Sequence, residues 1–112
     1  MFWYELDFKK IQPGCVTFAW RSGLTEEALK AAVENNARIM LCPGEHCYFD
    51  YPMAKGDMPE VNWGMPVTTL KDTYRLDPGW GMGEDFENNN LFGVAGTLWS
   101  ECINTPERIY YQ

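Results

Sequence analysis

The chain has 112 residues, which suffices for one small domain with a modest hydrophobic core. Its formal net charge of -7 provides no basic surface to neutralise phosphates, so we expect no nucleic-acid partner. Its apolar runs are too short to span a bilayer, so we expect no membrane partner either.

Aromatic side chains are abundant in this acidic chain, and its five tryptophans are spread along the sequence. Aromatic rings stack on the apolar faces of sugars, and carboxylates accept hydrogen bonds from sugar hydroxyls. The composition therefore fits carbohydrate binding, and it also fits an ordinary aromatic core.

The first half of the chain has the pattern of a parallel α/β unit. Short apolar or aromatic runs predict strands at residues 2–6, 15–20 and 38–42. Between the last two strands, Thr25 is the predicted cap of a helix with an apolar stripe, and Asn35 begins its predicted stop. Strand, helix and strand in this order are typical of the βαβ unit of a parallel sheet.

Pro43 and Gly44 are predicted to end the third strand, and a group of polar and aromatic residues follows it. On an extended backbone, Tyr48 and Asp50 would point to one side and Phe49 to the other. A phenol beside a carboxylate suits a ligand with hydroxyl or amide groups. The alternative is an exposed loop in which Asp50 accepts a bond from a backbone N–H and Tyr48 packs at the rim.

The second half of the chain alternates loops with short elements. Residues 52–68 are irregular and rich in proline and glycine, and because they include Trp63 we expect an ordered binding loop. Thr69 is the predicted cap of a short helix, residues 91–98 read as a strand, and Thr105 caps a helix with proline in its first position.

The four cysteines allow a disulfide framework or a metal site. Cys42, His46 and Cys47 lie close together, and zinc binds both residue types. Their spacing matches no zinc finger, however, and Cys15 and Cys42 stand in apolar runs, where cysteine behaves as a small hydrophobic side chain. We therefore predict no metal site and no cofactor, and keep a small zinc-binding domain as an alternative.

Aromatic and acidic residues recur where the predicted strands end. In parallel α/β sheets and barrels, ligands bind at the carboxyl ends of the strands. Four strands that each place such a group there are hard to explain by packing alone, so we predict a binding site at this edge. The residues are Trp3, Trp20, Tyr48, Asp50, Trp99 and Glu101.

Two motifs are distinctive: Tyr-Phe-Asp-Tyr at residues 48–51 and Leu-Trp-Ser-Glu at residues 98–101. In order and spacing, the chain resembles the C-terminal half of the catalytic barrel of family-20 glycoside hydrolases, the β-N-acetylhexosaminidases, over nearly its whole length. Ala95 departs from the family, which often has Gln or Glu there. We expect this difference to change the packing around Trp99 and not the sugar class. The matching segments, two of which contain these motifs, are residues 3–6, 16–21, 46–51, 69–74, 77–78 and 93–101.

The resemblance implies that residues 1–112 are the C-terminal half of a (β/α)8 barrel, with parallel strands five to eight and a long substrate loop at about residues 52–68. The implied activity is hydrolysis of terminal non-reducing N-acetyl-hexosamine residues by a retaining, substrate-assisted mechanism. In that mechanism the acetamido oxygen attacks the anomeric carbon, an Asp orients the acetamide, and an adjacent Glu is the general acid. The implied partner is an N-acetyl-hexosamine glycoside substrate.

The resemblance also implies a role for each candidate residue. Tyr48 would donate a hydrogen bond to the acetamido carbonyl, which makes it the catalytic residue implied within this chain. Asp50 and Glu101 would accept hydrogen bonds from sugar hydroxyls. Tryptophans would wall the acetamido methyl group and, from the long loop, stack on the sugar; these are Trp3, Trp20, Trp99 and, in the loop, Trp63.

The Asp–Glu pair of the family follows its fourth strand in a Gly-Gly-Asp-Glu-like motif, upstream of residue 1. The adjacent acids at residues 26–27 and 84–85 do not match that motif. We therefore expect the isolated chain to be inactive, to pair with the missing N-terminal half of the barrel, and to self-associate through open edges at residues 2–6 and 91–98. A non-catalytic carbohydrate-binding module is the main alternative.

Overall fold

The computed structural model of the protein describes residues 2–3, 11–21, 23–57, 64–77, 79, 90–103 and 105–111. The chain divides into two compact units. Unit 1 comprises residues 1–44 and 77–95, and unit 2 comprises residues 45–76 and 96–112. Each unit is described by itself.

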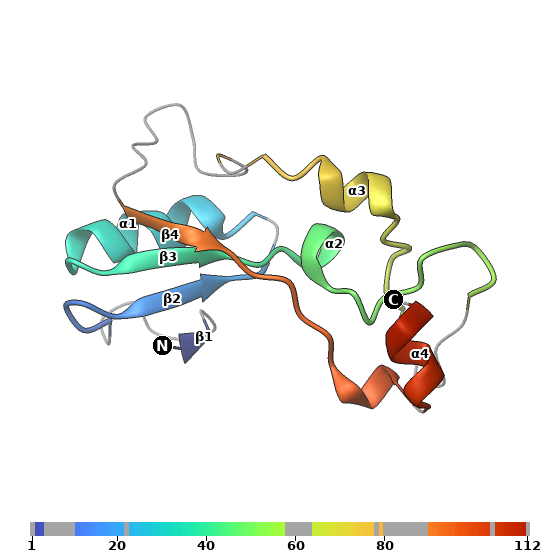
Figure 1. Cartoon of the computed structure of the whole chain (residues 1–112). Helices are drawn as coiled ribbons and strands as arrows, with labels where there is room; N and C mark the ends of the chain where they lie inside the picture. The colour runs from blue at the N-terminus through green and yellow to red at the C-terminus, as the bar shows by residue number, and fades with distance from the viewer. Residues whose placement is uncertain are drawn as a thin grey trace. The chain divides into compact units, whose positions relative to one another are not determined.

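Within the described residues, unit 1 is built on a four-stranded parallel sheet in the order β1-β2-β3-β4 (Figure 1). The predicted α/β class and the parallel strands are therefore confirmed, and the sheet is open. The second, third and fourth strands are shorter than predicted, and residues 4–6 of the first predicted strand lie outside the described residues. The strands are β1 (Phe2–Trp3), β2 (Val16–Ala19), β3 (Arg38–Leu41) and β4 (Leu91–Val94).

The core of unit 1 lies where helix α1 (Thr25–Glu34) packs against β2 and β3. Side chains of a strand alternate between its two faces, and in β3 Ile39 and Leu41 are fully buried while Arg38 is exposed. Residues opposite them in β2 are buried too, so one face of both strands meets the helix. The buried core residues are Ile11, Ala19, Ala28, Leu29, Ala31, Ala32, Ala37, Ile39 and Leu41.

The predicted cap of α1 is wrong, and its predicted stop is confirmed. Leu24 occupies the N-cap position, and Thr25 is instead the first helical residue, with 1% of its surface exposed. Burial of the Thr25 side chain in the core takes it away from the free N–H groups of the first turn. At the other end Asn35 is the C-cap, and Asn36 has a φ of 51°, a left-handed conformation that asparagine tolerates better than most residues.

Strand β4 ends at Val94, four residues before the predicted end. The N–H of Ala95 donates to the carbonyl of Leu41, which is the last residue of β3, so β3 offers no further partner. Among the residues that follow, Thr97 forms an isolated parallel bridge with Tyr48, and both residues belong to unit 2.

Unit 2 consists of short helices and irregular segments. Helix α2 (Gly44–Cys47) was not predicted and begins at the last residue of unit 1; α3 (Leu70–Tyr74), the 3-10 helix η3 (Ser100–Cys102) and α4 (Pro106–Tyr111) follow. Within the long segment at residues 52–68, the described parts contain neither helix nor strand, as predicted. Its ends are joined by a 2.8 Å hydrogen bond from the Thr68 N–H to the carbonyl of Pro52.

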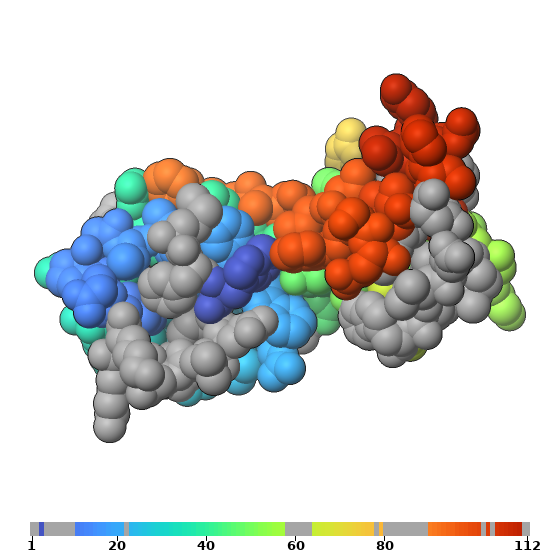
Figure 2. Space-filling model, turned by 90° about the horizontal axis from the view of Figure 1, so that it is seen from below, coloured from blue at the N-terminus to red at the C-terminus, as the bar shows by residue number. Residues whose placement is uncertain are grey.

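Both predicted caps in unit 2 are confirmed. Thr69 accepts a hydrogen bond from the N–H of Asp72 at 3.3 Å, and the Asp72 carboxylate accepts one from the N–H of Thr69 at 2.9 Å, which is a complete capping box. The Thr69 hydroxyl and N–H hold the pKa of Asp72 below its ordinary value. Thr105 accepts from the N–H of Arg108 at 3.4 Å at the start of α4, whose surface is visible in Figure 2.

Candidate functional site

A backbone bridge in unit 2 brings two distant segments together. Tyr48 and Thr97 pair in parallel. The N–H of Phe49 donates to the Thr97 carbonyl at 2.8 Å, and the N–H of Thr97 donates to the Cys47 carbonyl at 2.8 Å. Two hydrogen bonds in register fix both backbones, so the residues on either side of Thr97 and Tyr48 are held next to each other.

Three aromatic rings gather at this bridge. The ring centroids of Tyr48 and Tyr51 are 5.2 Å apart in an edge-on arrangement, and those of Tyr48 and Trp99 are 6.2 Å apart. Tyr48 and Tyr51 are buried, whereas Trp99 has 37% of its surface exposed. The cluster therefore presents the partly exposed Trp99 indole beside the buried Tyr48 ring, which in turn packs on Tyr51.

Asp50 completes the cluster from the inside. Only 2% of its surface is exposed, and its Oδ1 accepts a hydrogen bond from the N–H of Trp99 at 3.3 Å. A buried carboxylate is costly unless it is hydrogen-bonded, so this contact joins the two segments a second time. A carboxylate, a phenol and an indole within one cluster can together bind a ligand that has both polar groups and an apolar face.

Alternation predicted that Tyr48 and Asp50 share one side of the backbone and that Phe49 takes the other. Tyr48 and Asp50 are buried and Phe49 is exposed, which fits this prediction, but the backbone is not the extended segment that it assumed. The cause is a turn and not a strand, because the N–H of Tyr51 donates to the carbonyl of Tyr48 at 3.2 Å. The alternative of an exposed loop is wrong, although Asp50 does bind a backbone N–H as that alternative expected.

The other predicted site residues fall in three groups. Glu101 lies in η3, two residues after Trp99, and is exposed. Trp3 and Trp20 belong to unit 1: the Trp3 ring lies 4.7 Å from that of Phe18, and the Trp20 Nε1 is buried with no hydrogen-bond partner among the described residues. Trp63 lies outside the described residues.

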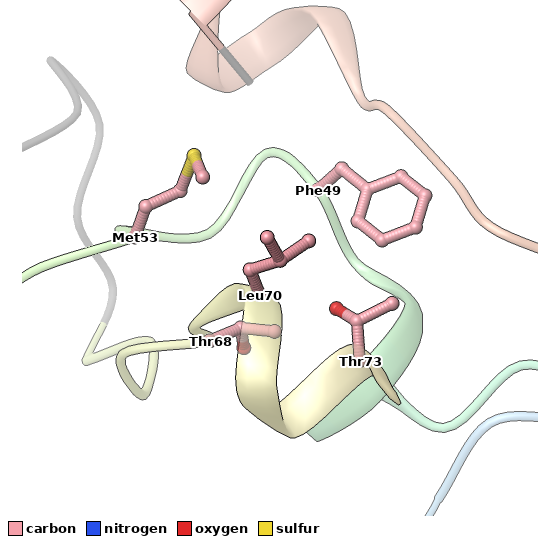
Figure 3. A pocket seen from close by; sticks show the side chains of 5 residues that line it. All are labelled: Phe49, Met53, Thr68, Leu70 and Thr73. Atoms are coloured by element: carbon pink, nitrogen blue, oxygen red, sulfur yellow. The ribbon is translucent and has the colours of Figure 1, made fainter. Parts of the chain in front are cut away.

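Sequence analysis did not anticipate an apolar pocket of about 160 Å³ on unit 2. Figure 3 shows Phe49 and Met53 on one side of it and residues around α3 on the other. Gly96 adjoins it, because a Cβ atom at this glycine would lie 2.3 Å from Cε2 of Phe49. Phe49 was assigned no role because alternation turned its side chain away from Tyr48 and Asp50. The lining residues are Phe49, Met53, Thr68, Leu70 and Thr73.

The zinc alternative is not supported. Among the residues that the structure describes, no three His, Cys, Asp or Glu side chains are placed so that they could hold a metal ion. The Nδ1 atom of His46 instead lies 2.6 Å from the backbone carbonyl oxygen of Asp72. In the same residues, no helix is long and apolar enough to cross a membrane.

Comparison with known proteins identifies the family. The model of the catalytic domain of glycosyl hydrolase family 20 matches residues 1–112. The chain belongs to this family. A β-hexosaminidase of Akkermansia muciniphila is 31% identical over 112 residues, which are 99% of this chain and 22% of that protein. The family predicted from the motifs is therefore confirmed.

Parts of two solved enzyme structures share the fold of this chain. A β-N-acetylhexosaminidase shares 33% identity at a TM-score of 0.72, covering 88% of this chain and 20% of that one. An exo-β-N-acetylglucosaminidase of Vibrio harveyi, solved with N-acetylglucosamine, shares 28% identity at a TM-score of 0.65, covering 86% and 15%. The chain thus spans about a fifth of the length of the relatives that it matches.

An ion pair fixes the segment after the cluster to the C-terminal helix. Arg108 of α4 donates from Nη1 and Nη2 to the two carboxylate oxygens of Asp57, at 2.6 and 3.2 Å. The side chains are only 16% and 12% exposed, and Asp57 also accepts from the N–H of Met53 at 2.9 Å. Burial raises the pKa of Asp57, but the hydrogen bonds from Arg108 and Met53 and the Arg108 charge outweigh it, and the pKa lies below its ordinary value.

This pair predicts an acid-sensitive contribution to stability. Because the folded-state pKa is depressed, the contribution is complete above the ordinary carboxyl pKa of about 4 and is lost as the pH falls through the lower folded-state value. Asp57→Asn should reduce the free energy of unfolding at pH 7 by about 1.5–3 kcal/mol and remove this part of the pH dependence. Urea unfolding of both proteins between pH 3 and pH 7 measures it.

Glu26→Gln is the matched control for Asp57→Asn. Glu26 pairs with Lys30 at 2.6 Å in α1, but both side chains are more than half exposed. Exposed pairs contribute about 0–1 kcal/mol, so this variant should lie close to the unmodified protein at every pH. An Asp57→Asn protein with the same pH dependence as the control would show that the pKa of Asp57 is not lowered in the folded protein.

Proposed function

We propose that the chain forms part of the catalytic domain of a retaining β-N-acetylhexosaminidase and supplies much of its sugar-binding pocket. The observation that supports this proposal is the cluster of Tyr48, Asp50 and Trp99, held together by the Tyr48–Thr97 bridge in a chain of family 20. The substrate class is a glycoside with a terminal non-reducing N-acetyl-hexosamine. The Vibrio harveyi relative solved with N-acetylglucosamine supports that choice of sugar.

In this proposal Tyr48 acts on the reacting group. Its phenol donates a hydrogen bond to the acetamido carbonyl oxygen of the substrate, which attacks the anomeric carbon and forms an oxazolinium intermediate while the aglycone leaves. The orienting Asp and the general acid Glu come from outside this chain. Tyr48 is suited to its role because its ring is fixed between Tyr51 and Trp99, which restricts the position of the hydroxyl.

The acids and tryptophans bind the rest of the sugar. Asp50 and Glu101 accept hydrogen bonds from sugar hydroxyls, Asp50 from its buried position and Glu101 from exposed η3. An indole offers an apolar face to the acetamido methyl group or to a sugar ring. We assign the contact with the acetamido methyl group to Trp3, Trp20 and Trp99. We assign stacking on the sugar ring to Trp63.

The proposed setting is one partial (β/α)8 barrel over residues 1–112, in which β1 to β4 are strands five to eight and residues 52–68 are the substrate loop. The parallel order of the four strands and the single helix between β2 and β3 support this placement. A complete barrel requires about 250 residues. The remaining strands and the Asp–Glu pair would therefore be contributed by other residues of the same enzyme.

The first test is hydrolysis of an aryl N-acetylglucosaminide. The isolated chain should show no turnover, because general acid catalysis alone is typically worth about 10²–10⁴-fold and the chain does not include that acid. The enzyme that contains this chain together with the Asp–Glu pair should hydrolyse the same compound. Turnover by the purified isolated chain would mean that the catalytic acids have been misassigned.

A second prediction concerns Tyr48→Phe in that enzyme. The hydrogen bond strengthens as the acetamide becomes an oxazolinium, so its loss should reduce kcat by roughly 10²-fold. KM should change much less, because the bond matters mainly in the transition state. Tyr110→Phe is the control, since Tyr110 is 91% exposed on α4. Steady-state kinetics measure both values. An unchanged kcat in the Tyr48→Phe enzyme would show that Tyr48 does not have this role.

We also propose that the isolated chain associates through its open sheet edges. Among the described residues, the sheet ends at β1 and at β4, and Phe92 and Val94 of β4 are 46% and 47% exposed. Unpaired N–H and C=O groups beside apolar side chains favour edge-to-edge pairing. In the enzyme the missing barrel strands would cover both edges.

Light scattering at several concentrations tests this association. The unmodified chain should form dimers or larger species, and Val94→Lys should shift it towards monomer because a charged edge opposes pairing. Val33→Lys introduces the same charge at a 50% exposed position of α1 and should have no such effect. A compact monomer with cooperative melting at every concentration would contradict the proposal.

A further inference from the structure

A histidine side chain joins the segment of Tyr48 to a separate helix. The Nδ1 atom of His46, in α2, lies 2.6 Å from the backbone carbonyl oxygen of Asp72, in α3, across 26 residues of sequence. A carbonyl oxygen only accepts hydrogen bonds, so the proton must be on Nδ1. His46 is therefore a donor whose acceptor is fixed in the backbone.

The acceptor end of this bond is held in place. Asp72 lies in the first turn of α3, and its side chain and N–H form the capping box with Thr69. A capped first turn is less free to fray than an uncapped one. The carbonyl that receives the His46 N–H thus belongs to a well-fixed part of the helix.

The donor end lies two residues before Tyr48. The Thr97 bridge holds the backbone on both sides of Tyr48, at the Cys47 carbonyl and at the Phe49 N–H. The segment is thereby attached from two directions, by α3 through His46 and by Thr97 through its backbone. Phe49 also faces residues of α3 across the pocket of Figure 3, so α3 is the element against which this segment is set.

We propose that His46 is a positioning residue for Tyr48. Its Nδ1–H bond to Asp72 sets the place of α2, and hence the place of the Tyr48 hydroxyl relative to the acetamide. This inference rests on the proposed function of Tyr48. His46 does not touch the substrate in this proposal, so the loss of its bond to Asp72 should act on kcat through Tyr48.

Three substitutions separate this bond from the mere presence of a polar ring. The amide nitrogen of asparagine stands as many bonds from Cβ as Nδ1 does, whereas that of glutamine corresponds to Nε2. In the enzyme that contains this chain, H46N should retain kcat within about twofold. H46Q and H46L should lower kcat by about 10–100-fold, as expected for a small misplacement of a reacting group, with a smaller change in KM.

A cycle with Tyr48 supplies the decisive measurement. If His46 acts through Tyr48, H46Q should have little further effect on kcat in the Tyr48→Phe enzyme. Equal loss of kcat in both backgrounds would overturn the inference, and so would an H46N enzyme as slow as H46Q. Glu26→Gln, in the exposed pair on α1, is the control for substitution as such.

The outcomes for the two proposals can be told apart. An unmodified enzyme that is inactive on every N-acetyl-hexosaminide would overturn the proposed function. An active enzyme in which H46N, H46Q and H46L all keep full kcat would overturn the positioning role alone. Melting temperatures of the variants show whether a slow enzyme is also unfolded. H46N and H46Q keep a polar side chain, so they remain informative if H46L does not fold.

Discussion

The site of unit 2 depends on one short stretch of backbone pairing between Tyr48 and Thr97. Two hydrogen bonds of 2.8 Å fix these residues, and every other contact of the cluster follows from them: the Trp99 ring beside Tyr48, and the Trp99 N–H on Asp50. Pairing over a single residue is weak by itself, because its ordering cost is close to what two hydrogen bonds return. Burial of the Tyr48 ring adds stabilisation that the bridge by itself lacks.

Each of the two bridged segments follows a strand that has already ended. β3 ends at Leu41, seven residues before Tyr48, and β4 ends at Val94, three residues before Thr97. The sheet itself belongs to unit 1. The stability of the sheet comes from the core under α1, where Ile39 and Leu41 are buried together with alanine and leucine side chains of the helix.

The sequence predicted local structure best where the cause is local. The caps Thr69 and Thr105 were found because a side-chain oxygen reaches an N–H only three residues away. The same rule wrongly predicted that Thr25 caps α1. The Thr25 side chain is buried in the core, and no local sequence pattern predicts burial of that kind. The βαβ unit was predictable because its period and its turn residues both agreed with the fold.

The sequence by itself determined the family, the parallel α/β class and the identity of the candidate residues, because motifs and periodicity are properties of the order of side chains. Only the tertiary structure decided that Tyr48 meets Trp99, that Asp50 is buried on a backbone N–H, that His46 reaches Asp72 and that Asp57 pairs with Arg108. Each of these contacts joins residues at least 26 positions apart. Such contacts form when the fold closes the loop between them, and no local propensity encodes that closure.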